Sequence, residues 1–326
     1  MLPAAAGLVN RQMPETSGSS KFGTCLCVSP TQTIQAIGSA LVVLVPYHSC
    51  MTKRAPLGPA VQHSPLQPLL DKGFDVKLLS HAGAIAAGDF PGALTELVEV
   101  IGAMQLPITE IIGSGGGETR FTQRLRRSLA QRGWHKHQFE IAKTVDGVPR
   151  ESTSHEVDHV KKFSAGVIAC EIEWNNKDPF FDRDLENFKR LHAEGAISLG
   201  VLVTRGISLQ GALWDAVMRF ARERDVRDMN SLVAQGVTPT PKQRANILRR
   251  TSRQGQPVAF AQAWADNFVS NKFGQATTHW SKLMSRVERG VGNPCPLLLL
   301  GLPASMLVFD HATVVAVTDD DLSDRA

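Results

Sequence analysis

The stretch His155–Lys177, HEVDHVKKFSAGVIACEIEWNNK, decides the fold class of this chain. Within it, Val167–Trp174 follows Gly166 and is rich in β-branched and apolar residues, which predicts a buried strand. Side chains alternate across a strand, so one face carries only apolar residues: Ile168, Cys170, Ile172 and Trp174. The other face carries two carboxylates, Glu171 and Glu173, roughly 6.6 Å apart along the strand.

Two like charges in a buried strand are costly unless a cation shares them, so this pair indicates a metal site. Asp158 lies thirteen residues before Glu171, and a bend through Lys161–Gly166 would bring its carboxylate beside the glutamates. Three converging oxygen donors suit Mg²⁺, which can lower the pKa of a bound water and stabilise charge on a phosphoryl oxygen. The alternative is an edge strand whose acidic face lies in solvent.

The same stretch contains a second pattern, because His155-Glu156-Val157-Asp158-His159 fits the H-E-x-x-H motif of zinc peptidases. That motif requires a helix. Here Val157 and Val160 lie among polar residues, strand-like residues follow, and Asp158 adds a charge inside the motif. The zinc peptidase is therefore the weaker alternative.

The elements around this stretch predict an α/β fold. A strand at Ala196–Thr204 follows a helix at about Asp182–Glu194, which together with the first strand makes a βαβ unit of parallel strands. Hydrophobic spacing predicts further helices at Phe90–Met104, Glu118–Arg132 and Leu209–Arg224. It also predicts a short strand or turn at Asp75–Leu79 and a buried strand at Cys295–Leu300. The glycine run Gly113–Gly117 lacks the Lys-Ser/Thr pair of a phosphate-binding P-loop.

Composition bounds the remaining possibilities. The 326 residues are 43% hydrophobic and 20% charged, which is enough for a sizeable core, and no apolar run is long enough to cross a bilayer. Residues 1–66 carry few charges and predict a poorly ordered extension, or a spurious one with Met51 as the true start; residues 67–326 then form a single domain. Five cysteines are an ordinary reduced complement, which favours a cytoplasmic location.

The net charge of +4 is too small to indicate a partner, but the charge distribution is uneven. Glu118–Lys162 contains ten basic and six acidic residues, and Arg205–Arg253 contains ten and four. Such stretches can face the phosphates of a nucleic acid, although arginine-rich helices often only present a solvated face.

The chain resembles the BglII-type restriction endonucleases, a group of the PD-(D/E)XK nuclease superfamily. The resemblance lies in EIEWNNKD at 171–178, FFDRDLENFKRLH at 180–192, GVLVTRG at 200–206, TTHWSKLMSRVERG at 277–290 and CPLLLLG at 295–301, with SHEVDHVK and GGGETRFTQRLRRSL upstream. It covers roughly residues 70–302 and leaves the N-terminal stretch out. It implies a restriction-endonuclease-like core, a central mixed β-sheet flanked by helices.

This resemblance also implies roles for residues. Asp158 and Glu171 match the metal-binding acids, and the backbone carbonyl of Ile172 would be a further Mg²⁺ ligand. Glu173 stands where the wider superfamily usually has Lys and where BglII and BstYI have Gln, whereas BamHI has Glu. Its role is open: it orients the attacking water, takes its proton or binds a second ion.

Other residues are weaker candidates. Glu118 is a possible fourth acid, or a glutamate favoured by the positive end of its helix. Six residues flanking the core are candidate DNA contacts: Lys177, Thr278, His279, Lys282, Arg286 and Arg289.

The function implied is a type II-like endonuclease that uses Mg²⁺ to hydrolyse double-stranded DNA at a short palindrome, leaving 5′-phosphate and 3′-hydroxyl ends. The resemblance further implies a homodimer and a cognate DNA methyltransferase. The alternatives are a non-catalytic DNA-binding protein of the same fold and the zinc metallopeptidase.

Overall fold

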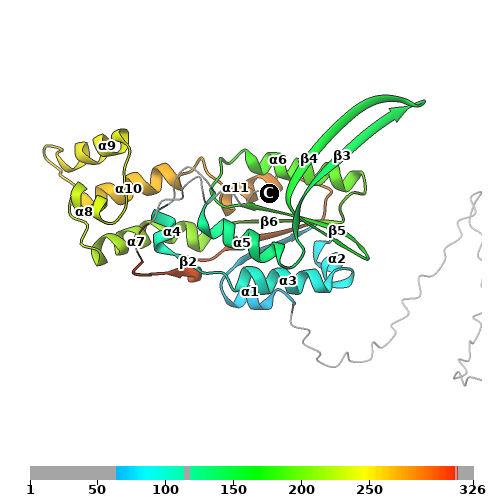
Figure 1. Ribbon diagram of the computed structural model, residues 1–326, viewed down its shortest axis with the longest axis horizontal. Coiled ribbons are helices and arrows are strands. Elements are labelled where there is room, and N and C mark those ends of the chain that lie inside the picture. The colour runs from blue at the N-terminus through cyan, green and yellow to red at the C-terminus, as the bar shows by residue number, and fades with distance from the viewer. Residues whose placement is uncertain (1–63, 114–117, 313, 315–326) are drawn as a thin grey trace, which may run out of the picture. The chain divides into compact units, whose positions relative to one another are not determined.

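A computed structural model describes residues 64–113, 118–312 and 314 of the chain (Figure 1). These residues belong to one compact unit, Val61–Ala326. The prediction for residues 1–66 lies outside the described residues except for residues 64–66. Within the described part, no helix combines the length and the apolar character that a bilayer crossing requires.

A six-stranded mixed sheet forms the centre of the unit, as predicted. Its strands follow the order β1 (Asp75–Leu79), β7 (Leu297–Leu302), β6 (Leu199–Arg205), β5 (Gly166–Glu173), β4 (Val148–Phe163) and β3 (His135–Val145). The central strands β5, β6 and β7 run parallel, while β1, β4 and β3 pair antiparallel with their neighbours. Every residue of β6 and β7 is buried, which is why both sequences are almost continuously apolar.

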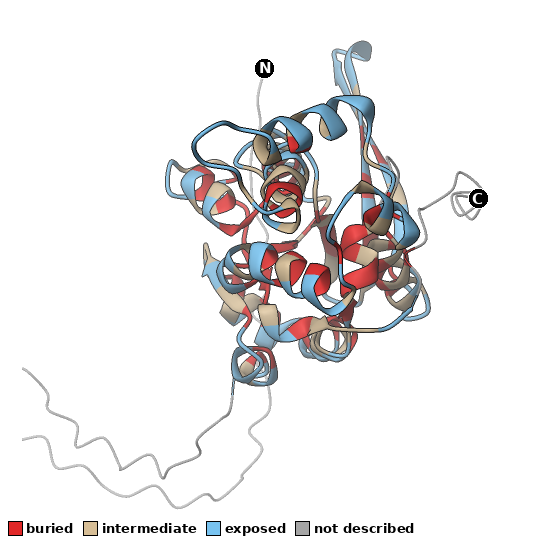
Figure 2. Cartoon of the chain, turned by 90° about the vertical axis from the view of Figure 1, so that its left-hand side faces the viewer, coloured by how far each residue is buried: buried red, intermediate tan, exposed pale blue. Residues whose placement is uncertain are grey.

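Helices cover both faces of this sheet, so the core has two halves (Figure 2). The larger half contains residues of α2 (Ala82–Gly88), α3 (Pro91–Gly102), α5 (Arg120–Ala130), α7 (Ile207–Glu223) and α10 (Phe260–Lys272). The smaller half contains residues of α6 (Phe180–Ala193) and α11 (Trp280–Val287). Shorter elements complete the description: α1 (Gln67–Asp71), α4 (Ile108–Ile112), η1 (Ala304–Met306), and β2 (Leu106–Pro107) paired with β8 (Leu307–Val308).

The predicted βαβ unit is present as β5, α6 and β6, with β5 and β6 parallel. Strand β6 begins three residues later than predicted because the N–H groups of Ala196 and Ile197 still donate to the Leu191 carbonyl at the end of α6. Gly200 lets α6 pack closely on β6, since a Cβ at this position would lie 2.7 Å from the Phe188 ring.

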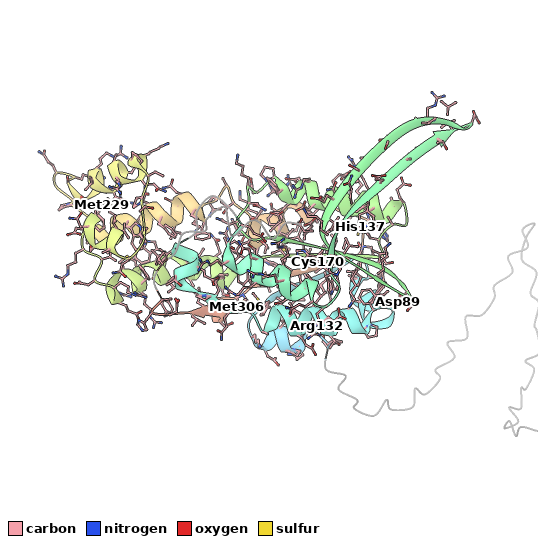
Figure 3. The ribbon with its side chains drawn as sticks, viewed as in Figure 1. Asp89, Arg132, His137, Cys170, Met229 and Met306 are labelled. Atoms are coloured by element: carbon pink, nitrogen blue, oxygen red, sulfur yellow. The ribbon has the colours of Figure 1, made fainter. Side chains whose placement is uncertain are left out.

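Strands β3 and β4 extend beyond the other strands as a long two-stranded ribbon (Figure 1). Its turn residues Asp146 and Gly147 have positive φ angles, and the flanking Val145 and Val148 are exposed. The register of the two strands shifts between His135 and His137, at the base of the ribbon where His137 lies (Figure 3). This irregularity lies beside Asp158.

The sequence did not predict the helices between α7 and α11. They are α8 (Met229–Ala234), α9 (Pro241–Thr251) and α10, and they lie at the end of the unit away from the ribbon (Figure 1). Capping boxes begin α8 at Asp228 and α9 at Thr240, which was a readable signal.

Candidate active site

Glu171 and Glu173 lie on the face of β5 that α6 covers. They share this face with Ala169 of the smaller core half, whereas Ile168, Cys170 and Trp174 belong to the larger half. Their relative exposures are only 5% and 3%, so the predicted acidic face is buried rather than solvated. Cys170, next to Glu171, lies in the middle of the sheet (Figure 3). The edge-strand alternative is therefore wrong.

Asp158 lies at the point where β4 and β5 separate. Their ladder ends at the pair His159 and Cys170, so Asp158 and Glu171 are the next residue on each strand. The Asp158 side chain is 54% exposed, and its carboxylate lies 3.9 Å from the Lys136 ammonium. The backbone thus brings Asp158 beside Glu171 as predicted, while its side chain points towards Lys136.

A fourth carboxylate, Asp184 of α6, completes the site and was missed by the sequence analysis. Its side chain is 1% exposed, and one carboxylate oxygen accepts a hydrogen bond of 2.8 Å from Nε of Arg183. Asp184 lies three residues after Phe181 and four before Phe188, both fully buried, so its spacing places it on the inward stripe of the helix. A carboxylate at such a position was the available signal.

Glu171, Glu173 and Asp184, here named the carboxylate cluster, all have raised pKa values, with burial as the largest cause. Burial raises the pKa of Glu171 well above its ordinary value, and the charges of Asp184, Asp158 and Glu173 raise it further. Burial followed by the Asp184 charge raises the pKa of Glu173 to about 9. Burial likewise raises the pKa of Asp184. The positive charge of Arg183 beside the cluster is therefore too small to keep these pKa values at their ordinary level.

Two neighbours compensate only part of this charge. Arg183 lies 3.6 Å from a carboxylate oxygen of Glu173, and the side-chain NH₂ of Asn176 donates to the other oxygen at 2.7 Å. One buried oxygen of Asp184 has no hydrogen-bond partner. The backbone of Glu173 is fixed, because its carbonyl accepts a hydrogen bond from the Thr204 hydroxyl at 2.8 Å.

The donor set fits a hard divalent cation in its chemistry. Carboxylate oxygens are the ligands that Mg²⁺ prefers, and a cation here would offset the repulsion that raises these pKa values. Yet nowhere in residues 64–113 and 118–312 do three Asp, Glu, His or Cys side chains converge closely enough to hold one ion. The residue types and their backbone positions suit such a cation. The Asp158 side chain would have to turn away from Lys136 to become a ligand.

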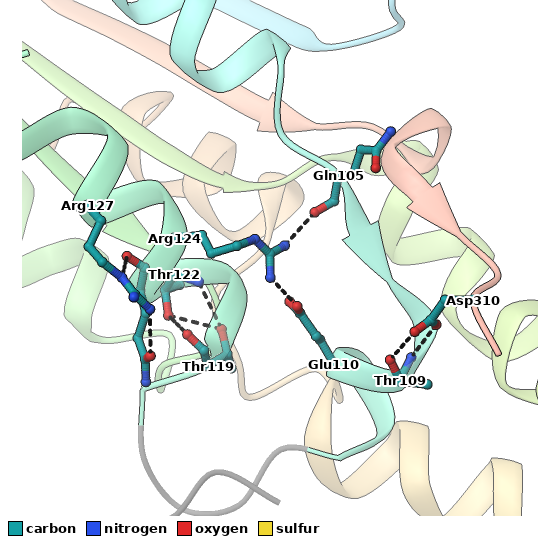
Figure 4. A network of polar contacts seen from close by, with 9 residues as sticks. Gln105, Thr109, Glu110, Thr119, Thr122, Arg124, Arg127 and Asp310 are labelled. Carbon is teal, nitrogen blue, oxygen red and sulfur yellow. Dashed lines mark hydrogen bonds and ion pairs between the residues drawn. The ribbon is translucent and has the colours of Figure 1, made fainter. Parts of the chain in front are cut away.

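Glu118 lies just before α5 and pairs with Arg126 of that helix at 3.6 Å. Arg126 is close enough to the site to lower the pKa of His159, after burial, the main cause. Helix α5 is anchored by Arg124, which bonds to Glu110 and, at 2.8 Å, to the Gln105 carbonyl, and by its N-terminal cap Thr119 (Figure 4). Glu118 is thus linked to the site through Arg126.

The six candidate DNA contacts fall into two groups. Lys177 and Arg289 are exposed, and Lys282 is half-buried with its ammonium 3.4 Å from Asp178. Thr278, His279 and Arg286 are buried. The Thr278 hydroxyl accepts a hydrogen bond from the Asn176 N–H, and Arg286 pairs with Asp178 and Asp182. Thr278 and Arg286 therefore hold the site together in this conformation, His279 is only buried, and the exposed residues remain available to a ligand.

The zinc peptidase motif is not formed. His155–His159 lies within β4, an extended strand, whereas the motif needs two histidines on one turn of a helix. His155 lies near Arg190 of α6, and Nδ1 of His159 lies 3.3 Å from the Cys170 carbonyl on the other side of the strand. The two rings do not converge, so the alternative is wrong.

Comparison with known proteins agrees with this geometry. The search among curated proteins found no similar sequence. The family model described as restriction endonuclease BglII/BglIII matches residues 74–302, which is more than half of the chain and includes every residue of the site. Such enzymes cleave DNA, so the alternative of a protein that only binds DNA is not supported. The chain belongs to the BglII/BglIII family of restriction endonucleases.

Proposed function

We propose that this DNA-cleaving enzyme depends on Mg²⁺ held by Asp158 and Glu171, with the backbone carbonyl of Ile172 as a further ligand and Glu173 completing the site. The observation that supports this most is the carboxylate cluster. Three nearly inaccessible acids with raised pKa values, beside a fourth acid, form a site that is stable only with protons or a cation. Mg²⁺ bound there would stabilise charge on a phosphoryl oxygen and lower the pKa of a bound water.

The reaction is hydrolysis of one phosphodiester bond. A water oxygen attacks the phosphorus in line, the bond from phosphorus to the 3′ oxygen breaks, and that oxygen takes up a proton. The water's protons pass to the cluster and to the product. The ends are a 5′-phosphate and a 3′-hydroxyl.

Glu173 has the properties of the proton acceptor in this scheme. Without a cation its pKa of about 9 keeps it protonated at neutral pH, and a cation bound beside it would lower that pKa so that the carboxylate can accept a proton. Asn176 and Arg183 position the carboxyl. Asn176 adjoins Lys177, so the segment that orients Glu173 also reaches the surface where DNA would bind. Glu118 is proposed as a more distant acid that orients Arg126 rather than as a ligand.

Further features follow from the family and are proposals here. The substrate site is a short palindrome in double-stranded DNA, which a homodimer would read symmetrically. Lys177, Lys282 and Arg289 would contact phosphates or bases, while Thr278, His279 and Arg286 would position them. A DNA methyltransferase that protects the same site is the expected partner.

The test is cleavage of a mapped plasmid by the full chain with and without Mg²⁺, followed by sequencing of the ends. Glu171→Ala should abolish Mg²⁺-dependent cleavage while near-ultraviolet circular dichroism shows a folded protein. Asp215→Ala, a change on the surface of α7, is the matched control and should cleave normally. A folded and fully active Glu171→Ala protein would overturn the assignment.

A further inference from the structure

Two cations, Arg205 at the end of β6 and Lys272 at the end of α10, lie together without a carboxylate partner in the described chain. This cation pair shows no ion pair with any acid among residues 64–113 and 118–312. Arg205 is completely buried, and its charge lowers the pKa of Lys272 after burial, the larger cause. A buried cation without a counter-ion is costly, so its retention needs a reason.

Neutral groups form the hydrogen bonds of these two cations. The Arg205 guanidinium donates to Asn175 Oδ1 at 3.0 Å, to the Thr277 hydroxyl at 2.7 Å and to the Thr278 carbonyl. Lys272 donates to the Ile111 carbonyl at 2.7 Å. Both cations lie over the Phe273 ring, with the guanidinium 4.8 Å and the ammonium 5.3 Å from its centre. Such contacts hold the side chains in place but supply no negative charge.

The acids on the neighbouring segments bond to other residues. Asp178, next to Lys177, pairs with Lys282 and Arg286. Asp266 of α10 accepts hydrogen bonds from Trp214 and Arg250, and Glu110 of α4 pairs with Arg124. None of them lines the cavity that Lys272 borders.

That cavity has a volume of about 550 Å³ and lies between the end of β5 and the helices α9 and α10. Its lining includes both Lys177 and Lys272 and, among the residues that the structure describes, no Asp or Glu. The N-terminal turn of the eleven-residue helix α9 also borders it, and a helix N-terminus carries partial positive charge. Asn175 lines the cavity too, and since its Oδ1 accepts from Arg205, its NH₂ group can donate to a ligand.

We propose that this cavity binds a phosphate group, held by Lys177 and Lys272 and by the neutral donors around them. A phosphate supplies the anion that the cation pair lacks, and amide and ammonium donors suit its oxygens. The group comes either from the DNA backbone or from a free nucleotide. The first source deepens the proposed function and rests on it, because Asn176, another lining residue, bonds to Glu173 and so places the cavity beside the cleavage site.

Calorimetric titration of the full chain with inorganic phosphate tests the site, and anisotropy of a short duplex in Mg²⁺-free buffer at several salt concentrations tests the DNA source. Lys272→Met should weaken phosphate binding by about tenfold, the loss of one charged hydrogen bond. For duplex binding it should reduce the slope of log affinity against log salt by about 0.9. Lys177→Met should weaken phosphate binding and reduce the salt slope in the same way. Because Lys177 is exposed, this change should leave the protein folded.

Lys162→Met is the matched control and should change neither measurement, because Lys162 is exposed and pairs with Val167 at the start of β5, whereas the cavity lies beyond the end of β5. Phosphate affinity that depends on Lys272 together with an unchanged duplex slope supports the site and identifies a free anion as its ligand. A changed slope supports the DNA backbone. If Lys272→Met and Lys177→Met both leave phosphate affinity and slope unchanged, the proposal is overturned.

The outcome is separable from that of the nuclease assignment. Glu171→Ala should retain binding that depends on Lys272, because it leaves the cavity intact. An active Glu171→Ala enzyme would refute the carboxylate assignment and leave the result for the cavity unaffected. If Glu171→Ala abolishes cleavage but phosphate binding does not depend on Lys272 or Lys177, only the cavity proposal is refuted.

Discussion

The short segment Trp174–Lys177 connects two regions of opposite charge. On one side lies the carboxylate cluster, which has more negative charge than Arg183 can offset. On the other lies the cation pair, with more positive charge than its neutral partners can offset. Asn175 bonds to the cation pair and Asn176 to the cluster, so consecutive residues connect them. The fold keeps opposite charges apart instead of pairing them, which costs stability and leaves both available to a ligand.

The two regions also differ in how they can relieve their charge. The cluster can take up protons, since the pKa of Glu173 is about 9. Lys272 can release one, since burial lowers its pKa to about 7. Burial also lowers the pKa of Arg205, but only to about 9, so it stays charged at neutral pH. Stability should therefore respond to pH in opposite directions in the two regions.

The largest expected effect concerns the cluster. Glu171→Gln keeps the size of the side chain but removes its ability to carry charge, so Mg²⁺-dependent cleavage should fall on the order of a thousandfold. The free energy of unfolding in metal-free buffer should change by less than about 1 kcal/mol, because the raised pKa already favours the neutral form of Glu171. Plasmid cleavage and urea unfolding measure the two effects.

Glu186→Gln on α6 is the control for this change, since Glu186 pairs with Lys189 and Arg190 and lies outside the cluster. It should leave cleavage unchanged. Loss of activity with an equal loss of stability in Glu171→Gln would mean that Glu171 is structural, and the contrast between the two regions would fail.

The next effect concerns the cation pair. Arg205→Met fills the same volume but leaves three acceptors without their donor, namely Asn175, Thr277 and the Thr278 carbonyl. We expect a net loss of about 2 kcal/mol in the free energy of unfolding, because these lost bonds outweigh the relief of burying one charge less. Urea unfolding measures it, with Arg222→Met on the exposed face of α7 as control. A more stable Arg205→Met protein would show that the buried charge dominates.

Local patterns in the sequence predicted one region much better than the other. Glu171 and Glu173 could be placed on one face because strand periodicity depends only on the residues of β5. Asp184 was predictable in principle from its spacing to Phe181 and Phe188, but a buried carboxylate was not expected on an otherwise apolar stripe. The mixed sheet and the βαβ unit likewise followed from apolar runs.

The cation pair could not be predicted in this way. Arg205 ends an apolar strand and was unremarkable in sequence, because its partners Asn175 and Thr277 lie 30 and 72 residues away. The position of Lys272 depends on how α10 packs against α7 and α9, and the helices α9 and α10 were not predicted. The direction of the Asp158 side chain was also beyond the sequence, since it depends on Lys136 and on the register shift in β3.

A smaller effect tests whether Asp184 belongs to the cluster. Asp184→Asn removes one negative charge beside Glu173, so the Mg²⁺ concentration for half-maximal cleavage should rise several-fold, roughly 1 kcal/mol of electrostatic attraction. Cleavage rates over a range of Mg²⁺ concentrations measure it. Asp182→Asn on the same helix, whose carboxylate pairs with Arg286, is the control. An unchanged Mg²⁺ requirement would confine Asp184 to a structural role.

The last effect is the pH response of Lys272. Between pH 7 and 10 the unfolded chain holds a proton on this lysine that the folded chain has lost, because its pKa is about 7 when folded. The free energy of unfolding therefore gains a contribution that rises with pH, at most about 1.4 kcal/mol per pH unit. The raised pKa of Glu173 has the opposite effect up to about pH 9, because there the folded chain holds a proton that the unfolded chain has lost. Its contribution to the free energy of unfolding therefore falls as pH rises.

Lys272→Met removes only the rising contribution, so its stability should fall more steeply than that of the unaltered chain as pH increases above 7. Urea unfolding at several pH values measures the difference, and Lys242→Met at the exposed start of α9 should leave the profile unchanged. Parallel profiles for Lys272→Met and the unaltered chain would mean that Lys272 titrates normally. Arg205 would then be the buried cation of the pair. Since Arg205 stays charged at neutral pH, the contrast between the two regions would depend on its charge alone.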